Sequence, residues 1–317
     1  LDNEIRSLCP LVYYHVWDNY PYPMYNKKFY ESNDYIACIS RLTHDIVKKV
    51  APAVPNSYLP HAVDANIFVS HTPEQRKALR KEVLPKEAQD KFIVFWNNRN
   101  ARRKQSGSLV WWWKEWLDDR DLHDKAMLLM HTDPKDAHGQ DLTHMSDHLG
   151  VDNGQIMFSN EKVPIESMST FYNIADVTIN IADAEGFGLA TLESLSCGTP
   201  IIATMTGGLQ EQIVGADTYV VPLFPASKAI IGSQQVPYIY EDRLSRDQVL
   251  SALSNMYDLG DKGRAKMGDK GRQHVLQNYN FNNFRERWVN LMLKIYEEHG
   301  SWDTRKLYSS VVFKEIA

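Results

Sequence analysis

Cysteine, long apolar runs and an excess of charge of one sign are all scarce in this sequence of 317 residues. The three cysteines, Cys9, Cys38 and Cys197, are scattered without a C-x-x-C pair, which favours reduced thiols in a cytoplasmic protein over a disulfide framework. No apolar run approaches the ~20 residues of a membrane span, and no signal peptide is expected; peripheral contact with a membrane stays open. A net charge of −5 argues against nucleic acid as a partner.

The alternation of short apolar runs with helical stretches predicts an α/β protein of two domains, on a prior of about 150 residues each. Helices are expected at 41–50, capped by Ser40, and at 109–117, 189–197 and 281–298. The charged stretch 75–91 is predicted to be a solvated helix between the domains. Strands are expected at 11–14, 34–40, 92–96, 126–130, 156–158, 177–182, 201–203 and 219–221. This order predicts parallel, doubly wound sheets, which bind ligands beyond the carboxyl ends of their strands.

The most informative segment runs from Glu185 to Glu193, with the sequence Glu-Gly-Phe-Gly-Leu-Ala-Thr-Leu-Glu. It joins a predicted strand to a predicted helix, so its free backbone N–H groups and the helix dipole favour phosphate binding. Gly186 and Gly188 let the backbone approach an anion closely because they carry no Cβ. The two carboxylates suit hydroxyl groups on either side of a diphosphate. The pattern therefore indicates a nucleotide sugar, and the alternative is an ordinary strand and helix with surface glutamates.

This segment resembles the E-x7-E signature of retaining GT-B glycosyltransferases of the large family 4 kind. Residues 171–176, Phe-Tyr-Asn-Ile-Ala-Asp, resemble the "lY..AD" helix end of that family. Residues 198–211 contain Gly-Thr-Pro-Ile-Ile-Ala and Gly-Gly-Leu-Gln-Glu, which resemble its "G.PvIat..gG..E" run. Residues 58–68 resemble its "ipnGVd...F" segment, with Ala62 in place of the usual glycine.

The resemblance implies a GT-B fold: two Rossmann-like, doubly wound domains that face a cleft. It covers about residues 10–298 and implies that the N-terminal domain is incomplete, because the first half of the acceptor domain is absent. The expected organisation is an acceptor-side part at 1–68, a linker at 69–91 and a nucleotide-sugar domain at 92–279. A crossover helix at 280–298 would pack back on the first domain, and the tail at 299–317 matches nothing identifiable.

Four cations follow the first strand of the predicted second domain: Arg99, Arg102, Arg103 and Lys104. They could neutralise a departing diphosphate. In the family an Arg and a Lys lie about five residues apart here. Arg99 and Lys104 fit this spacing, Arg103 is the competing assignment, and the bland alternative is a solvated basic loop. Asn98 replaces the glycine that usually precedes the arginine.

His15 ends a predicted strand and resembles a family histidine that faces the cleft, hydrogen-bonds the transferred sugar and titrates near neutrality. Asp18 is a weaker candidate for the acceptor side. The resemblance also implies donor contacts from Thr191 and from Asn160, within the base-recognition segment 159–162.

A metal site is an alternative function for the histidines of residues 131–148, of which His144 and His148 could share one helical face. No tight group of four ligands emerges, so no metal is predicted. The helix at 109–117 carries three consecutive tryptophans, which are interpreted as core. Its predicted apolar face comprises Leu109, Trp112, Trp113, Trp116 and Leu117.

These observations predict a metal-independent, retaining glycosyltransferase that needs no cofactor. The substrate would be a nucleoside-diphosphate sugar, with UDP or GDP as the nucleotide, and the acceptor is unidentified. Glu185 is expected to bind sugar hydroxyls, Glu193 the ribose, and the N–H groups of Phe187, Gly188 and Leu189 the phosphate. The alternatives are a non-catalytic nucleotide-binding or protein-interaction module and, with less support, a nucleotide-sugar epimerase.

Overall fold

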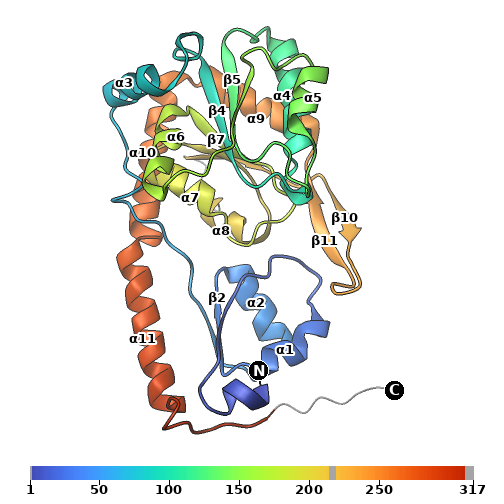
Figure 1. Ribbon diagram of the computed structural model, residues 1–317, viewed down its shortest axis with the longest axis vertical. Helices are drawn as coiled ribbons and strands as arrows, with labels where there is room; N and C mark the ends of the chain where they lie inside the picture. The colour runs from blue at the N-terminus through green and yellow to red at the C-terminus, as the bar shows by residue number, and fades with distance from the viewer. Residues whose placement is uncertain (1, 214–218, 311–317) are drawn as a thin grey trace.

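The computed structural model describes residues 2–213 and 219–310, which form two α/β domains stacked one above the other (Figure 1). The first domain contains a parallel sheet of order β1-β2-β3, with β1 at Val12–His15, β2 at Tyr35–Cys38 and β3 at Asn56–Tyr58. Its helices are a π-helical turn at Asp2–Arg6, a 3-10 turn at Met24–Asn26, α1 at Lys27–Glu31 and α2 at Arg41–Val50.

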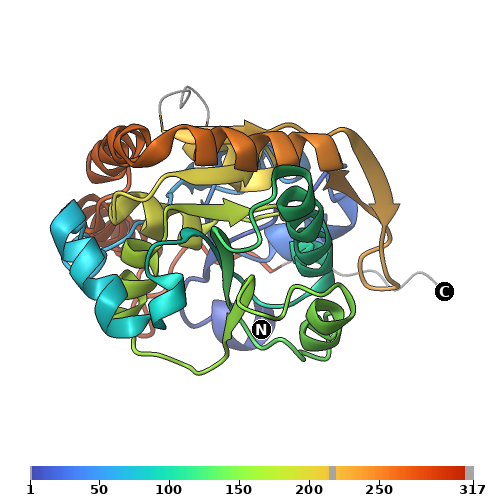
Figure 2. The ribbon, with the colours of Figure 1, turned by 90° about the horizontal axis from the view of Figure 1, so that it is seen from above.

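The second domain is built on a six-stranded parallel sheet of order β6-β5-β4-β7-β8-β9. Its strands are β4 (Phe92–Asn97), β5 (Ala126–His131), β6 (Ile156–Ser159), β7 (Val177–Asn180), β8 (Ile201–Thr204) and β9 (Val220–Leu223). Strand order reverses between β4 and β7, where such sheets bind ligands. Helices lie on both faces of this sheet (Figure 2).

The helices of the second domain follow the predicted alternation with the strands. They are α3 (Pro73–Val83), α4 (Ser106–Arg120), α5 (Leu142–His148), α6 (Ile165–Ile174), α7 (Leu189–Ser196), α8 (Gln210–Ile213), α9 (Arg246–Asp258) and α10 (Gly260–Asn278). Short 3-10 turns occur at Lys86–Ala88, Arg102–Lys104 and Gly207–Leu209. A two-stranded antiparallel hairpin, β10 (Ser227–Ile231) and β11 (Ile239–Arg243), has no counterpart in the sequence prediction.

Helix α11 (Phe281–His299) runs from the second domain down the side of the first (Figure 1). It begins at Asn280, whose side chain accepts a hydrogen bond from Asn283 N. Leu291 and Ile295 are buried in a cluster with Tyr35 and Ala37 of β2. The helix thus packs on the first domain.

The charged helix α3 differs from the solvated bridge that its composition predicts. Arg80 on α3 pairs with Asp176 at 2.7 Å and donates to the carbonyl of Ile174, so α3 is fastened to the second domain. Thr72 and Gln75 form a capping box at its start. The link between the domains is therefore shorter than 69–91, because its helical part belongs to the second domain.

The tryptophan-rich helix α4 confirms most of the predicted core. Leu109, Trp113, Trp116 and Leu117 are at most 1% exposed, whereas Trp112 is only partly buried. Trp113 also donates its indole N–H to the carbonyl of Gln155 at 3.0 Å. By contrast, Trp111 on the opposite side is 54% exposed.

We predict that Trp113→Ala lowers the free energy of unfolding by roughly 3–5 kcal/mol, because it removes a fully buried indole and leaves a cavity. Trp111→Ala, on the same helix, is expected to change it by less than about 1 kcal/mol. Urea unfolding followed by circular dichroism measures both values. Equal losses in the two variants would contradict the packing of α4.

Candidate active site between the two domains

The turn at residues 185–188 is held in shape by backbone contacts that leave no room for side chains. Gly188 caps α7 with a φ of +88°, a conformation that favours glycine, and a Cβ there would lie 2.8 Å from Leu209 Cδ1. Gly208 donates its N–H to the carbonyl of Glu185 at 2.8 Å, and a Cβ on Gly208 would overlap the carbonyl oxygen of Gly186. The double glycine at 207–208 is therefore required by the turn.

Buried polar groups support the same turn from below. Gln212 donates to the carbonyl of Phe187, while the Thr191 hydroxyl lies 2.6 Å from the carbonyl oxygen of Gly188. The Phe187 ring is buried against Tyr279. These bonds use the carbonyl oxygens of the turn and not its N–H groups, which are therefore able to donate to a ligand. Within the described part of the chain, residues 2–213 and 219–310, the N–H groups of residues 187, 188 and 189 donate no hydrogen bond.

Two cations from the loop before α4 face this turn. Lys104 Nζ pairs with the Glu185 carboxylate, and the side chains are only 9% and 12% exposed. Burial lowers the pKa of Lys104, and the negative charge of Glu185 opposes that shift. Arg103 donates to the carbonyl of Ala184 at 2.6 Å and has no carboxylate partner among the described ion pairs. Both cations therefore lie where a diphosphate over α7 would need them.

The other two cations of the loop point away from the turn. Arg99 pairs with Asp136 at 2.6 Å, and its side chain is 60% exposed. Arg102 makes two 2.8 Å bonds to Glu241 of the hairpin. Of the predicted Arg and Lys pair, the structure brings Lys104 to the turn and leaves Arg99 outside it. The competing assignment, Arg103, lies next to Lys104.

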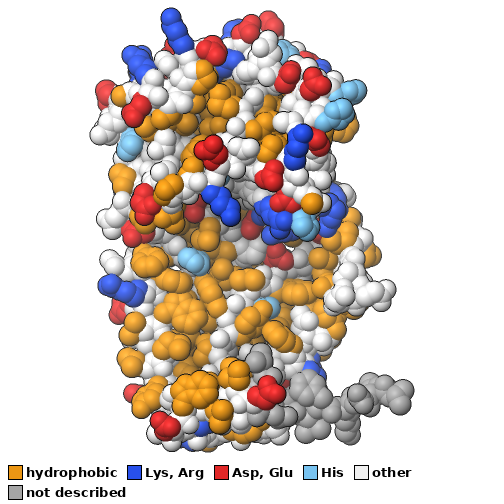
Figure 3. Space-filling model, in the orientation of Figure 1, with side chains coloured by type: hydrophobic (Ala, Val, Ile, Leu, Met, Phe, Trp, Pro, Cys, Tyr) orange, Lys and Arg blue, Asp and Glu red, His pale blue; other side chains and the backbone are white. Residues whose placement is uncertain are grey.

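Asp18, a weak candidate in the sequence analysis, belongs to the same group of charges. It lies on the first domain, yet it interacts electrostatically with Arg103, Glu185 and Lys104 of the second. Burial raises the pKa of Asp18 to about 6, and the two cations offset part of that rise. The signal in the sequence was only its place three residues after His15. Figure 3 shows Lys, Arg, Asp and Glu side chains gathered around the hollow between the two domains.

Glu193 lies eight residues beyond Glu185, on α7. It accepts a hydrogen bond from Tyr172 at 2.5 Å through Oε2, and Asn97 in turn donates to Tyr172 at 2.9 Å. Burial raises the pKa of Glu193, although the Tyr172 bond opposes the rise. Asn160 is exposed in the loop after β6. The two glutamates and this loop thus line one edge of the sheet, at the carboxyl ends of β4, β6 and β7.

His15 differs from the near-neutral histidine that the sequence predicts. It is 3% exposed, and its Nε2 lies 2.7 Å from the Tyr30 hydroxyl of α1. Burial lowers the pKa of His15 to about 4, so the imidazole is neutral at pH 7. Its Nδ1 is buried without a hydrogen-bond partner among the described residues. A contact with the transferred sugar stays a prediction, with a neutral ring as its donor or acceptor.

Glu211 joins the two domains beside the site. Its carboxylate accepts the N–H of Arg41, the first residue of α2, at 2.6 Å and the hydroxyl of Tyr58 at 2.7 Å. A carboxylate at a helix start is favoured by the helix dipole. A Cβ on Gly208 would also come within 2.7 Å of Ser40 Cβ, so the second domain touches the start of α2 directly.

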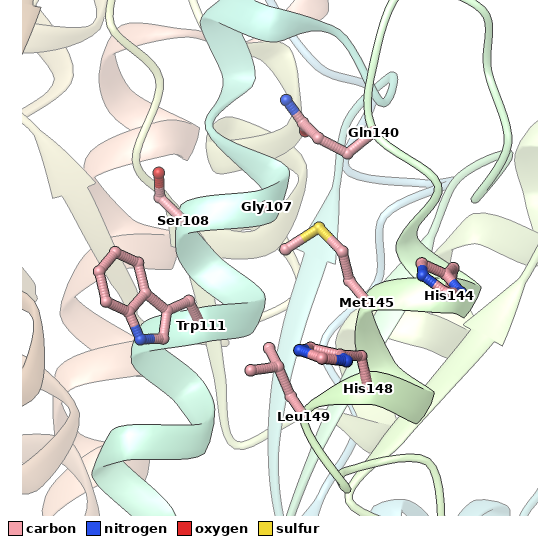
Figure 4. A pocket seen from close by; sticks show the side chains of 8 residues that line it. All are labelled: Gly107, Ser108, Trp111, Gln140, His144, Met145, His148 and Leu149. Carbon is pink, nitrogen blue, oxygen red and sulfur yellow. The ribbon is translucent and has the colours of Figure 1, made fainter.

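A separate pocket lies between α4 and α5, away from the charged cluster (Figure 4). Trp111, Met145 and Leu149 give it apolar walls, while His144 and His148 stack along α5 with ring centres 6.4 Å apart. Across residues 2–213 and 219–310, no three potential metal ligands from His, Cys, Asp and Glu lie together. The metal hypothesis for these histidines therefore gains no support.

None of the described helices combines the length and the apolar character that a membrane span requires.

Comparison with solved structures identifies the class of fold. Sucrose-phosphate synthase from Thermosynechococcus elongatus superposes with a TM-score of 0.69 at 20% identity, over 87% of this chain and 61% of that one. Anabaena HepE in complex with UDP-glucose superposes with a TM-score of 0.70 at 14% identity, over 90% of this chain and 72% of that one. The fold is GT-B, as predicted.

Sequence comparison gives a partial family match and several distant relatives. Residues 120–231, which lie within the second domain, match the model of glycosyl transferases group 1. A GDP-mannose-dependent monoacylated alpha-(1-6)-phosphatidylinositol monomannoside mannosyltransferase from Corynebacterium glutamicum is 24% identical over 82% of this chain. A D-inositol 3-phosphate glycosyltransferase from Arthrobacter sp. is 29% identical over 39% of it. This chain spans 62% of the length of the first relative and 26% of that of the second.

Because the pKa of Asp18 is raised, we predict that Asp18→Asn increases the free energy of unfolding by an amount that depends on pH. The folded protein holds this proton to about pH 6, whereas an unfolded aspartate loses it near 3.8, so ionisation costs stability as the pH rises between those values. At pH 7.5, Asn is expected to stabilise by on the order of 1 kcal/mol. At pH 3.5 the two proteins should be equal.

Urea unfolding at the two pH values measures this difference. Asp152→Asn, at an exposed position of the second domain, is the matched control and should show no pH-dependent gain. An equal effect of Asp18→Asn at both pH values would contradict the placement of Asp18 in the cluster.

Proposed function

We propose that this chain belongs to a retaining, metal-independent glycosyltransferase that moves a sugar from a nucleoside diphosphate to an acceptor. One observation carries the proposal. The buried Lys104–Glu185 pair lies between the two domains, beside N–H groups at the start of α7 that donate no hydrogen bond to the described residues. Burying an ion pair removes water from both charges at a cost that can exceed their attraction, so stability alone does not account for this pair. The group 1 match and the GT-B fold support a sugar as the transferred group.

Each part of the donor has a matching group in this arrangement. The diphosphate would lie over the N–H groups of residues 187–189, with Arg103 and Lys104 pairing its charge. The ribose hydroxyls would bind Glu193, and the base would lie near Asn160. Glu185 would bind sugar hydroxyls and stabilise positive charge at the anomeric carbon. Arg99 would act only if its bond to Asp136 broke.

The reaction would replace the bond from the anomeric carbon to the diphosphate oxygen by a bond to an acceptor oxygen on the same face. The acceptor proton would pass to the leaving diphosphate oxygen, so no protein nucleophile is required. Arg103 and Lys104 would stabilise the charge that develops on the leaving group.

UDP and GDP are both candidate nucleotides. Anabaena HepE was solved with UDP-glucose, and the Corynebacterium relative is named as GDP-mannose-dependent. The cytoplasm is the proposed location, on the sequence argument from unpaired cysteines; Cys9, Cys38 and Cys197 are free thiols in the structure.

A non-catalytic nucleotide-binding module is the second candidate. It is favoured by one observation about the first domain, the expected acceptor side. Among the described residues, its sheet has three strands, whereas the sheet of the second domain has six. This module would bind the donor without transferring its sugar.

We predict that one of UDP, GDP and ADP raises the melting temperature of the protein, because it binds only the folded state. A ligand at 100 times its dissociation constant adds about 2.7 kcal/mol. Glu193→Ala should remove most of this shift, whereas Glu286→Ala, on the exposed face of α11, should retain it. A thermal-shift assay measures all three proteins. No shift with any diphosphate would contradict the proposed donor site.

We further predict that Glu185→Gln lowers turnover by about 10²-fold or more, because it removes one preorganised charge from the reacting centre. The assay follows release of UDP from UDP-glucose and of GDP from GDP-mannose, with methyl glycosides as acceptors. Donor binding without any product from the wild type would select the non-catalytic module. Wild-type turnover in Glu185→Gln would exclude Glu185 from catalysis.

A further inference from the structure

The segment that follows β1 is rich in aromatic side chains and lies next to the charged cluster. Residues 16–25, here called the aromatic loop, read Val-Trp-Asp-Asn-Tyr-Pro-Tyr-Pro-Met-Tyr. At its start, a Cβ on Gly186 would be 3.1 Å from the Val16 carbonyl oxygen. Two residues on, Asp18 interacts with Lys104 and Glu185. The aromatic loop therefore begins at the sugar end of the proposed donor site.

The hairpin of the second domain borders the same loop. Tyr240 of β11 donates its N–H to the carbonyl of Tyr20 at 2.7 Å and accepts a bond from the Asn19 amide at 2.8 Å. The hairpin is fixed to its own domain by Arg243, which pairs with Asp183 at 2.6 Å, and by the Arg102–Glu241 bonds. In Figure 1 it reaches down beside the first domain. Both domains thus build this surface.

The ring orientations in the loop are set by contacts within it. Trp17 and Tyr25 meet with ring centres 6.1 Å apart at 67°, and Tyr20 meets Tyr22 at 5.3 Å and 87°. The Trp17 indole N–H is already bonded to the carbonyl of Asn19 at 2.8 Å. The polar edge of Trp17 is therefore occupied, and the ring faces are what the loop can offer to a ligand.

The hairpin adds a further aromatic ring to this surface. Tyr238 near its tip lies close enough to Tyr25 for the two hydroxyls to interact electrostatically. Tyr25 is 39% exposed and Tyr238 is 47% exposed. One ring from each domain therefore stands open at the outer end of the aromatic loop, while the carboxylate of Asp18 lies at its inner end.

We propose that the aromatic loop and Tyr238 form an acceptor subsite for a saccharide. A pyranose offers C–H groups on its faces, which pack on aromatic rings, and hydroxyls on its rim, which bind carboxylates such as Asp18 and Asp45. Rings with few rotatable bonds lose little entropy when they bind. The inference rests on the proposed function, because the inner end of the loop touches the site where the donor sugar would lie.

The charged side chains next to the aromatic loop favour a saccharide over a lipid surface as its ligand. Lys27 and Lys28 on the adjacent α1 lie 3.8 and 3.1 Å from Glu31, so their charge is partly balanced. Asp45 accepts hydrogen bonds from the hydroxyls of Tyr20 and Tyr22. A surface that carries carboxylates and balanced lysines lacks the excess of cations that anionic membranes attract.

Saturation-transfer NMR on the full chain tests the subsite. The probes are methyl α-D-mannopyranoside, methyl α-D-glucopyranoside and methyl β-N-acetylglucosaminide, each alone and together with UDP or GDP. At least one probe is expected to bind, and Tyr25→Ala and Tyr238→Ala should each weaken it by about fivefold or more. Tyr296→Ala on α11, at a side chain that is 58% exposed, should leave binding unchanged.

The proposal is overturned if no probe binds the folded wild type or if the two tyrosine variants bind as the wild type does. It is also overturned if Tyr296→Ala causes an equal loss. Vesicles of phosphatidylcholine with 30% phosphatidylglycerol form a second arm. Cosedimentation that depends on Tyr25 would assign the surface to lipid instead.

The diphosphate-induced rise in melting temperature separates this inference from the proposed function. A rise without saccharide binding rejects the subsite and leaves the donor site in place. Saccharide binding that depends on Tyr25 and Tyr238, without any rise, supports a saccharide-binding surface and rejects the nucleotide donor.

Discussion

The close approach of two backbone segments, 185–188 and 207–208, is the constraint on which the rest of the site depends. Only glycine fits at Gly208, because a Cβ would overlap the carbonyl oxygen of Gly186. This contact aligns the turn with the start of α7, and it brings Glu211 onto the first turn of α2 in the other domain. The same short segment therefore shapes the proposed anion site and contacts the other domain.

The electrostatics of the cleft follow from that geometry. Lys104 and Glu185 are buried together, and Asp18 of the other domain interacts with both. Burial lowers the pKa of Lys104 and raises that of Asp18, although their opposite charges offset part of each shift. Such strain costs stability in the free protein. It is typical of sites whose charges are arranged for a ligand or a transition state, since a bound diphosphate would draw on the two cations without rearranging them.

Much of the fold could be predicted from local sequence patterns. Ser40 caps α2 as predicted, the strand before Glu185 ends in the expected turn, and α4 buries the predicted side of its tryptophans. Each prediction depended on residues close together in the chain. The limits came from long-range partners: Asp136, 37 residues away, holds Arg99 outside the cleft.

Two further features lay beyond the reach of the sequence patterns. The hairpin β10–β11 has polar and apolar residues without strict alternation, and no Asn-Gly turn marks its tip. The pKa of His15 depends on burial by residues of α1 and β2, which no local pattern reveals. Spacing identified which residues could serve a nucleotide sugar, whereas only the packing separated Arg103 from Arg99.

The most direct test of the account is a crystal structure of the chain with the nucleoside diphosphate that stabilises it. The account predicts phosphate oxygens within hydrogen-bond distance of the N–H groups of residues 187–189 and of Lys104 Nζ, with the ribose on Glu193. A diphosphate bound elsewhere, such as between α4 and α5, with the Lys104–Glu185 pair undisturbed, would contradict it.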